Sequence, residues 1–133
     1  MMPLQRILMV EDEADIQEVA RLALEAVGGY TVEMCSSGAE ALQRAPEFAP
    51  DLILLDVMMS GMDGPTTLEQ LRRIPALENT PIIFMTAKVQ PPEVARYKAL
   101  GALDVISKPF DPMALSDQVA AIWQACQTRR APV

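Results

Sequence analysis

The sequence predicts an α/β fold in which a five-stranded parallel sheet carries helices on both faces. Five short, almost continuously apolar runs alternate with segments of helical periodicity, and strands covered on both faces have this composition. The runs are Arg6 to Val10, Thr31 to Cys35, Leu52 to Leu55, Ile82 to Met85 and Leu103 to Ile106. Repeated strand–helix units of this size form parallel sheets with right-handed crossovers, so the alternation predicts one doubly wound unit.

The first two segments between the runs carry clear helix signals. The first has the periodicity of an amphipathic helix and is followed by a glycine pair, Gly28-Gly29, that ends it. Its apolar positions are Ile16, Val19, Ala20, Ala23 and Val27. In the second segment Ser37 is followed by Glu40 three residues later. This capping-box spacing predicts that the second helix begins there.

Prolines mark the remaining three helices. Gly64-Pro65 begins the third helix and Pro75 ends it. Pro91-Pro92 begins the fourth, which ends near Gly101, and Asp111-Pro112 begins the fifth, since proline is well placed in a first helical turn. The apolar faces comprise Leu68 and Leu71 in the third helix, and Leu115, Val119, Ile122 and Cys126 in the fifth.

Length and charge narrow the possible functions. A chain of 133 residues with 50% apolar and 22% charged residues predicts one globular domain over residues 1–133, with a core from about 5 to 127 and short tails. The 18 acidic residues outnumber the 11 basic ones, and the net charge is -7. Because nucleic acids are polyanions, this charge argues against a nucleic-acid partner.

Other composition features favour a reduced, cytoplasmic setting. The longest purely apolar runs are a few residues long, whereas a membrane-spanning helix needs about 20, and no export signal is present. Cys35 and Cys126 form neither a C-x-x-C pair nor a metal-binding spacing. The sequence contains no histidine, which removes the commonest general base and zinc ligand.

Acidic, hydroxyl and ammonium groups follow four of the five predicted strands. Glu11 and Asp12 come after the first strand, Asp56 after the third, Thr86 after the fourth and Lys108 after the fifth. In a parallel sheet of this kind, ligands bind at the carboxyl ends of the strands. These five side chains are therefore expected to converge at one edge.

The predicted cluster favours a hard divalent cation and phosphoryl chemistry. Three carboxylates within a few ångström repel one another by about 4 kcal/mol per pair at 4 Å and an effective dielectric constant of 20. Lys108 supplies one positive charge, and an all-oxygen ligand set selects Mg²⁺ for the rest. A carboxylate beside Mg²⁺ and an ammonium has what phosphoryl transfer requires, so Asp56 is predicted to form an aspartyl phosphate. Alone, each residue is better explained as a cap or a surface charge, and it is their joint placement that predicts the site.

The motifs at these positions resemble those of a bacterial two-component response-regulator receiver domain, from one end of the chain to the other. The matching stretches are Ile7 to Glu13, Asp51 to Met59, Gly61 to Gly64, Met85 to Ala87 and Ser107 to Phe110. Each stretch alone is weak, but together they are highly specific. The resemblance implies the flavodoxin-like receiver fold with sheet order 2-1-3-4-5, five helices and a cis Lys108–Pro109 bond.

The resemblance also implies a role for each site residue. Asp56 is the expected phosphoacceptor, and Mg²⁺ is expected to bind Glu11, Asp12, Asp56 and the main-chain carbonyl of Met58. Thr86 and Lys108 are expected to stabilise the phosphoryl group and to take part in the switch. Further positions implied by the family are Met58 and Lys88, which flank the site where members tune the lifetime of the phosphoryl group.

Two positions depart from the family pattern. Val105 stands where the family usually has a Tyr or Phe three residues before the lysine, so the usual aromatic switch is in doubt. Ser60 replaces a frequent proline after Asp56, which predicts a modest loosening of that loop.

The implied partners are proteins rather than small molecules. The expected phosphodonor is a phosphohistidine on a histidine kinase or a histidine phosphotransfer protein, and no small-molecule substrate is expected. The expected readout is binding of a downstream protein or a second copy to the face formed by the fourth helix, fifth strand and fifth helix. That face is expected to carry Val89, Pro91, Pro92, Arg96, Tyr97, Leu103 and Val105. A stand-alone receiver is expected, since no output module follows the fifth helix in the sequence.

Three alternatives remain open from the sequence. An aspartate-nucleophile phosphatase needs a second acid two residues after its nucleophile, and Met58 stands there. A flavodoxin-like FMN carrier needs hydroxyls and glycines in its first loop, where this chain has Glu11 and Asp12. A receiver fold that docks partners without switching is supported by Val105 alone.

Overall fold

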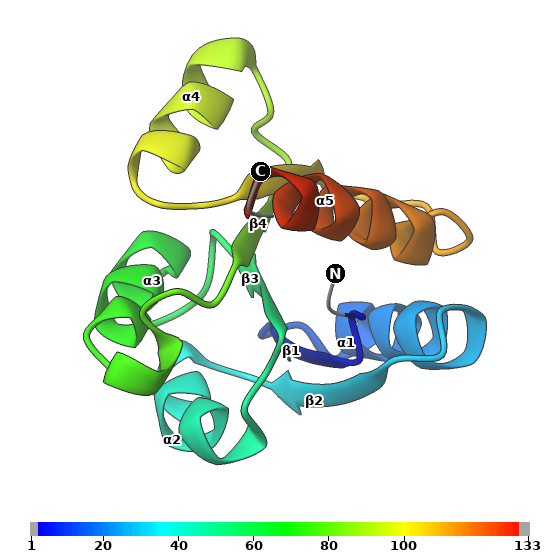
Figure 1. The fold of residues 1–133 in the computed structure, drawn as a ribbon, viewed down its shortest axis with the longest axis horizontal. Helices are drawn as coiled ribbons and strands as arrows, with labels where there is room; N and C mark the ends of the chain where they lie inside the picture. The colour runs from blue at the N-terminus through cyan, green and yellow to red at the C-terminus, as the bar shows by residue number, and fades with distance from the viewer. Residues whose placement is uncertain (1–2, 131–133) are drawn as a thin grey trace.

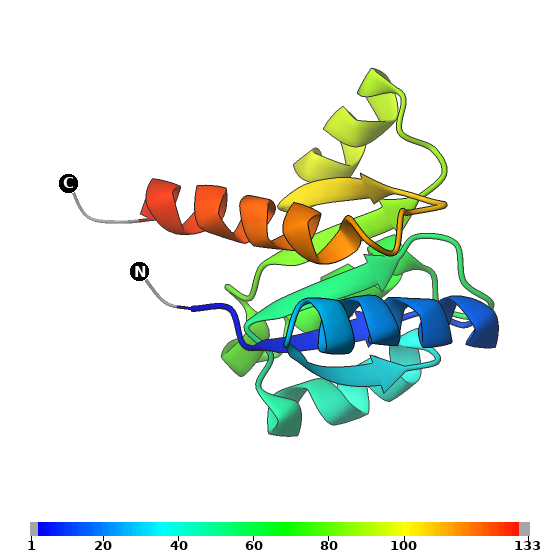
Figure 2. The ribbon, with the colours of Figure 1, turned by 90° about the vertical axis from the view of Figure 1, so that its right-hand side faces the viewer.

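A computed structural model describes residues 3–130 and has the predicted layered α/β architecture (Figures 1 and 2). Its five strands are β1 (Arg6–Val10), β2 (Thr31–Cys35), β3 (Leu52–Asp56), β4 (Ile82–Thr86) and β5 (Asp104–Ser107). They form one parallel sheet in the order β2-β1-β3-β4-β5. The predicted fold class and strand order are confirmed, and every predicted strand lies within one residue of the observed one.

Helices cover both faces of this sheet. They are α1 (Ala14–Arg21), which continues as a π-helical segment (Leu22–Val27), α2 (Gly38–Phe48), α3 (Gly64–Arg72), α4 (Pro91–Ala99) and α5 (Leu115–Arg130). A short 3-10 turn, Pro75–Leu77, follows α3. Side chains of α1 and α5 join one apolar layer against the sheet, and those of α2, α3 and α4 join the layer on the other side. The middle strands are therefore covered on both faces, which explains their continuous apolar sequences.

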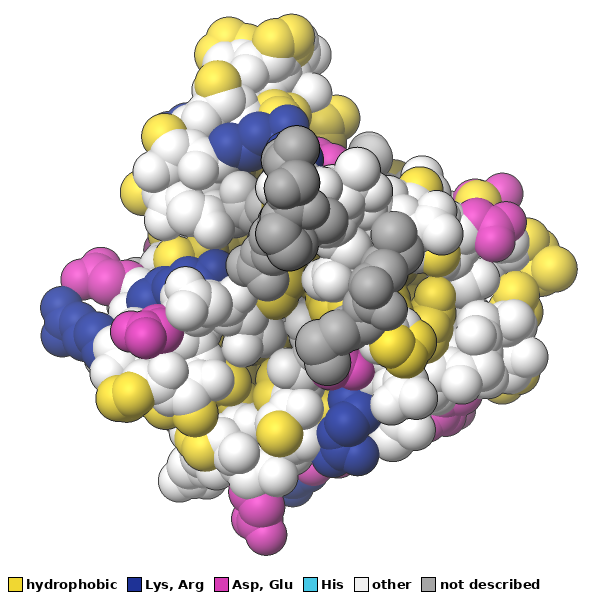
Figure 3. Space-filling model, viewed as in Figure 1, with side chains coloured by type: hydrophobic (Ala, Val, Ile, Leu, Met, Phe, Trp, Pro, Cys, Tyr) yellow, Lys and Arg dark blue, Asp and Glu magenta, His cyan; other side chains and the backbone are white. Residues whose placement is uncertain are grey.

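All five strands run in the same direction, so their carboxyl ends lie together at one end of the molecule. In Figure 2 the arrowheads point away from the end at which residues 3 and 130 lie. Figure 3 views the molecule from the end that carries residues 3 and 130, opposite the carboxyl ends of the strands, and acidic and basic side chains are interspersed on this face. Within residues 3–130, no helix is long and apolar enough to cross a membrane.

The predicted start of the fifth helix is wrong for a local reason. The fifth helix begins at Leu115, not at Asp111, because residues 111 to 114 form a turn in which the Asp111 carboxylate accepts a hydrogen bond from the Met113 amide at 2.9 Å. The third helix ends at Arg72, before Pro75, as predicted, and Pro75 begins the 3-10 turn. At its other end α5 continues to Arg130.

The apolar face of the first helix is also predicted incompletely. Val19 and Val27, placed on that face by the 3.6-residue period, are 40% and 50% exposed, whereas Leu24 is fully buried. The π-helical segment over residues 22 to 27 accounts for Leu24 and Val27, because it changes the number of residues per turn and so rotates these side chains relative to the sheet. Val19 lies before this segment, in α1.

Candidate functional site

Strands β1 and β3 place two acidic side chains inside the molecule. Glu11 directly follows β1, and its amide donates to the Cys35 carbonyl oxygen at 3.0 Å, which keeps it in line with the sheet. Asp56 is the last residue of β3 and pairs in register with Met85 of β4. Glu11 is 0% and Asp56 4% exposed. Carboxylates are rarely buried to this degree without a compensating positive partner.

Asp12 completes a three-carboxylate cluster, and Lys108 is its positive partner. One oxygen from each of Glu11, Asp12 and Asp56 lies within 4.8 Å of the others. The Lys108 Nζ atom lies 2.8 Å from Glu11 Oε1 and 3.3 Å from Asp56 Oδ1. Three negative charges thus face one ammonium, and two of the negative charges remain unbalanced. The all-oxygen donor set and the residual charge both fit a hard dication such as Mg²⁺.

Burial and neighbouring charge shift the proton affinities of this cluster. Removal from water, reinforced by the Glu11 charge, raises the pKa of Asp56 to about 6 even though Lys108 opposes the shift. Burial alone lowers the pKa of Lys108, but the hydrogen bond to Glu11 and the charges of Asp56 and Glu11 outweigh it and raise that pKa overall. Lys108 therefore remains cationic at neutral pH, and Asp56 is mostly ionised there.

Thr86 and Lys108 reach the site through the ends of β4 and β5. Thr86 is the last residue of β4 and is 2% exposed. Its Oγ1 accepts a hydrogen bond from the Lys88 amide at 3.1 Å, and its carbonyl oxygen accepts one from the Lys108 amide at 2.9 Å. The Lys108–Pro109 peptide bond is cis, as expected. These contacts hold the two loops beside each other at the acidic edge.

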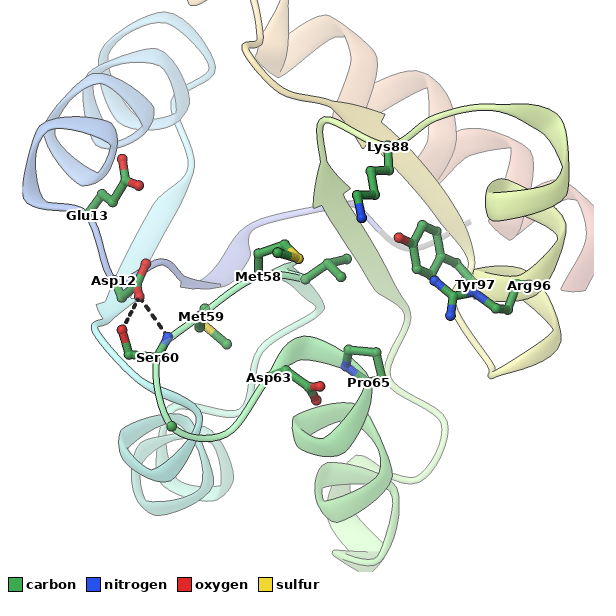
Figure 4. Close-up of a pocket in the computed structure, with 12 residues that line it drawn as sticks. Asp12, Glu13, Met58, Met59, Ser60, Asp63, Pro65, Lys88, Arg96 and Tyr97 are labelled. Atoms are coloured by element: carbon green, nitrogen blue, oxygen red, sulfur yellow. Dashed lines mark hydrogen bonds between the residues drawn. The ribbon is translucent and has the colours of Figure 1, made fainter.

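A contact that the sequence did not reveal joins Asp12 to the loop after β3. The Ser60 amide donates to Asp12 Oδ2 at 3.0 Å, and the Ser60 hydroxyl lies 3.3 Å from the same oxygen (Figure 4). The backbone hydrogen bond from Ser60 lowers the pKa of Asp12 and so stabilises its ionised form. The sequence predicts a looser loop because Ser60 replaces a proline, but that prediction did not include these hydrogen bonds from Ser60 to Asp12. The two residues are 48 positions apart, and no local pattern connects them.

An open pocket of about 620 Å³ lies beside the carboxylates. Asp12 and residues 57 to 61 line one side of it, and Lys88, Arg96 and Tyr97 line the other (Figure 4). Met58 is 67% exposed. Met58 and Lys88, the two positions expected to tune phosphoryl lifetime, thus border one cavity from opposite sides.

Tyr97 corrects the expected readout surface. The face of the fourth helix, fifth strand and fifth helix is expected to carry Tyr97, but its side chain is 1% exposed and belongs to the buried layer under α4. Its ring meets Phe84 of β4 edge to face, with centroids 5.4 Å apart, and Arg96 stacks on it at 5.1 Å. Val105 of β5 is partly buried and packs against the same layer. An aromatic ring thus lines the pocket beside the carboxylates, but it comes from α4 and not from position 105.

Comparisons with known proteins agree with this geometry. The family model for the response regulator receiver domain matches residues 7–120. The alkaline phosphatase synthesis transcriptional regulatory protein PhoP of Bacillus subtilis is 39% identical over 89% of this chain and 48% of its own length. The DNA-binding response regulator MtrA of Mycobacterium tuberculosis is 37% identical over 88% of this chain and 50% of its own. The chain thus spans about half the length of these curated relatives.

Solved structures give the same result. The chemotaxis response regulator CheY4 of Vibrio cholerae superposes with a TM-score of 0.83 at 30% identity, over 90% of this chain and 99% of that one. The signal receiver domain of a signal transduction histidine kinase from Syntrophus aciditrophicus superposes with a TM-score of 0.77 at 34% identity, over 91% of both chains.

These matches place the chain among the proteins of two-component signal transduction. It belongs to the response regulator receiver domain family. Receiver domains are signalling modules rather than catalytic enzymes, and the cluster of Glu11, Asp12 and Asp56 is consistent with their phosphoacceptor site.

Proposed function

We propose that the chain is a phosphoacceptor switch of a phosphorelay in which Asp56 takes a phosphoryl group from a phosphohistidine. The observation that carries the proposal is the position of Asp56. It is a buried strand-end carboxylate, 3.3 Å from the Lys108 ammonium and within 4.8 Å of two further carboxylates. Because a lone cation does not balance three anions, the cluster calls for a dication as well as Lys108.

The proposed reaction is a phosphoryl transfer to a carboxylate. An Asp56 oxygen forms a bond to phosphorus while the phosphorus–nitrogen bond of the donor breaks, and the electron pair of that bond stays on the imidazole nitrogen. A Mg²⁺ ion bound by Glu11, Asp12, Asp56 and the Met58 carbonyl would supply positive charge to the phosphoryl oxygens. Lys108, already beside Asp56, pairs with one phosphoryl oxygen, and the Thr86 hydroxyl donates to another.

The proposed signal is a shift of the loops that end β4 and β5. A phosphoryl group adds negative charge at Asp56 and attracts Lys108 and Thr86, whose loops are already joined by the Lys108 amide to Thr86 carbonyl hydrogen bond. The face formed by α4, β5 and α5 borders both loops, so we place the readout by a downstream protein or a second copy there. Equal binding with and without a phosphoryl mimic would argue against this readout.

Intact mass after incubation with a small acyl phosphate and Mg²⁺ tests the phosphoacceptor. The expected result is a gain of one phosphoryl group by the unmodified chain and none by Asp56→Asn. Asp104→Asn is the matched control, because Asp104 is a strand residue outside the cluster, and it should gain the group normally. A chain that gains no phosphoryl group from any donor would instead be a static docking module.

A further inference from the structure

The three carboxylates of the cluster differ in their burial and in the groups that contact them. Glu11 and Asp56 are buried and contact Lys108. Asp12 lies in the β1–α1 loop and is partly exposed, and its carboxylate accepts hydrogen bonds from the amide and the hydroxyl of Ser60 in the β3–α3 loop. The position of Asp12 thus depends on a residue that reaches it from another loop.

Both Ser60 donors end on the same oxygen of Asp12. The amide at 3.0 Å and the hydroxyl at 3.3 Å approach Oδ2, which leaves Oδ1 outside this pair of hydrogen bonds (Figure 4). Two donors on one oxygen fix the plane of a carboxylate more firmly than one donor does. They also support its charge against the repulsion of Glu11 and Asp56.

The residue type at position 60 decides whether this anchor exists. Serine offers an amide and a hydroxyl to Asp12, whereas proline, a frequent residue here in the receiver family, offers neither donor. This chain therefore has a hydrogen-bonded partner for Asp12 that a proline-containing loop lacks.

We propose that Ser60 is a positioning residue that orients the Asp12 carboxylate for a divalent cation, through its amide and hydroxyl hydrogen bonds to Oδ2. This inference rests on the proposed role of the cluster as a Mg²⁺ site. Partners that orient a ligating carboxylate raise metal affinity, and their loss typically weakens binding by 10- to 100-fold.

Calorimetric titration of Mg²⁺ into the metal-free full chain tests the inference with a graded series at one position. Ser60→Thr keeps both donors, Ser60→Ala keeps the amide alone, and Ser60→Pro keeps neither. The expected order of Mg²⁺ affinity is Ser60 equal to Thr, then Ala, then Pro, with Pro weaker by roughly tenfold. Urea unfolding in a chelator shows that each variant is folded, so a loss of affinity cannot be attributed to a loss of structure.

Three outcomes would overturn the inference. They are a folded Ser60→Pro that binds Mg²⁺ as tightly as the unmodified chain, a Ser60→Thr that binds as weakly as Pro, and an unmodified chain that binds no Mg²⁺. Phosphorylation is measured separately by intact mass. If the affinity series holds but Asp56 gains no phosphoryl group, then the proposed function fails and the role of Ser60 stands.

Discussion

At the scale of single residues, the most unusual group is the Asp56 carboxyl. Burial first, and the Glu11 charge second, raise its pKa from 3.8 to about 6. The folded chain therefore keeps a proton on Asp56 over a pH range in which the unfolded chain has lost it. This proton stabilises the fold below pH 4, and the stabilisation is lost as the pH rises through about 6.

Without metal, the free energy of unfolding should fall between pH 4 and pH 6.5 because of this residue. A pKa difference of about 2 units corresponds to roughly 2–3 kcal/mol. Urea unfolding in a chelator measures the effect as the difference between the unmodified chain and Asp56→Asn, which lacks the titrating group.

Asp12→Asn is the matched control for this prediction. The hydrogen bond from Ser60 lowers the pKa of Asp12, so this group contributes stability that is lost only as the pH falls below 3.8. Asp12→Asn should therefore keep the slope between pH 4 and pH 6.5. A slope that is unchanged in Asp56→Asn would contradict the assignment.

At the scale of secondary structure, α4 is attached to the sheet through few buried side chains. Tyr97 is its one buried residue among those the structure describes for Pro91–Ala99, whereas α2 and α3 each bury three or more. Figure 1 shows α4 standing apart from the other helices at one end of the sheet. Its attachment thus depends on the edge-to-face contact of Tyr97 with Phe84. Elements with few buried contacts open most readily.

Tyr97→Ala should detach α4 while leaving the sheet folded. Loss of a buried aromatic ring lowers the free energy of unfolding by about 3–5 kcal/mol in a rigid core. Here the decrease is expected to be smaller, because α4 can open locally while the rest of the chain stays folded. Hydrogen exchange should show faster exchange across residues 91–99 and unchanged protection in β1 and β3.

Tyr97→Phe is the control, because it keeps the ring and its contact with Phe84. Protection of α4 in this variant should match that of the unmodified chain. If residues 91–99 keep full protection in Tyr97→Ala, then other contacts of α4 are sufficient to hold it.

The sequence predicted strands better than helix details. Buried parallel strands have apolar runs with sharp ends, and each was predicted to within one residue. The π-helical segment over residues 22 to 27 and the turn before Leu115 are local irregularities that an ideal 3.6-residue period does not represent. The burial of Tyr97 depends on how α4 sits on Phe84, which is a tertiary contact.

The candidate site was predicted for the same reason as the sheet. A parallel arrangement of the strands predicts five side chains at one edge, namely Glu11, Asp12, Asp56, Thr86 and Lys108. The structure brings four of them, Glu11, Asp12, Asp56 and Lys108, into direct proximity. Ser60 was noted as a departure from a family pattern, but its bond to Asp12 depends on the fold of two loops. Composition and spacing do not describe such a contact.

At the scale of the whole molecule, the site joins distant parts of the chain. The hydrogen bond from Lys108 to Glu11 links residues 97 positions apart, and Asp56 lies between them in the sequence. The cluster is formed by residues at or just after the carboxyl ends of β1, β3 and β5, so it needs the sheet to be assembled from β1 across to its β5 edge.

This separation has a consequence for biosynthesis. A ribosome must synthesise more than a hundred residues before it adds Lys108, whose ammonium balances the acidic side chains. Contacts between residues so far apart in the sequence also form late in folding, because the entropy of loop closure opposes them. A nascent or prematurely terminated chain thus carries the acceptor aspartate without its counter-charge. Competence to receive a signal is in this way tied to the completion of folding.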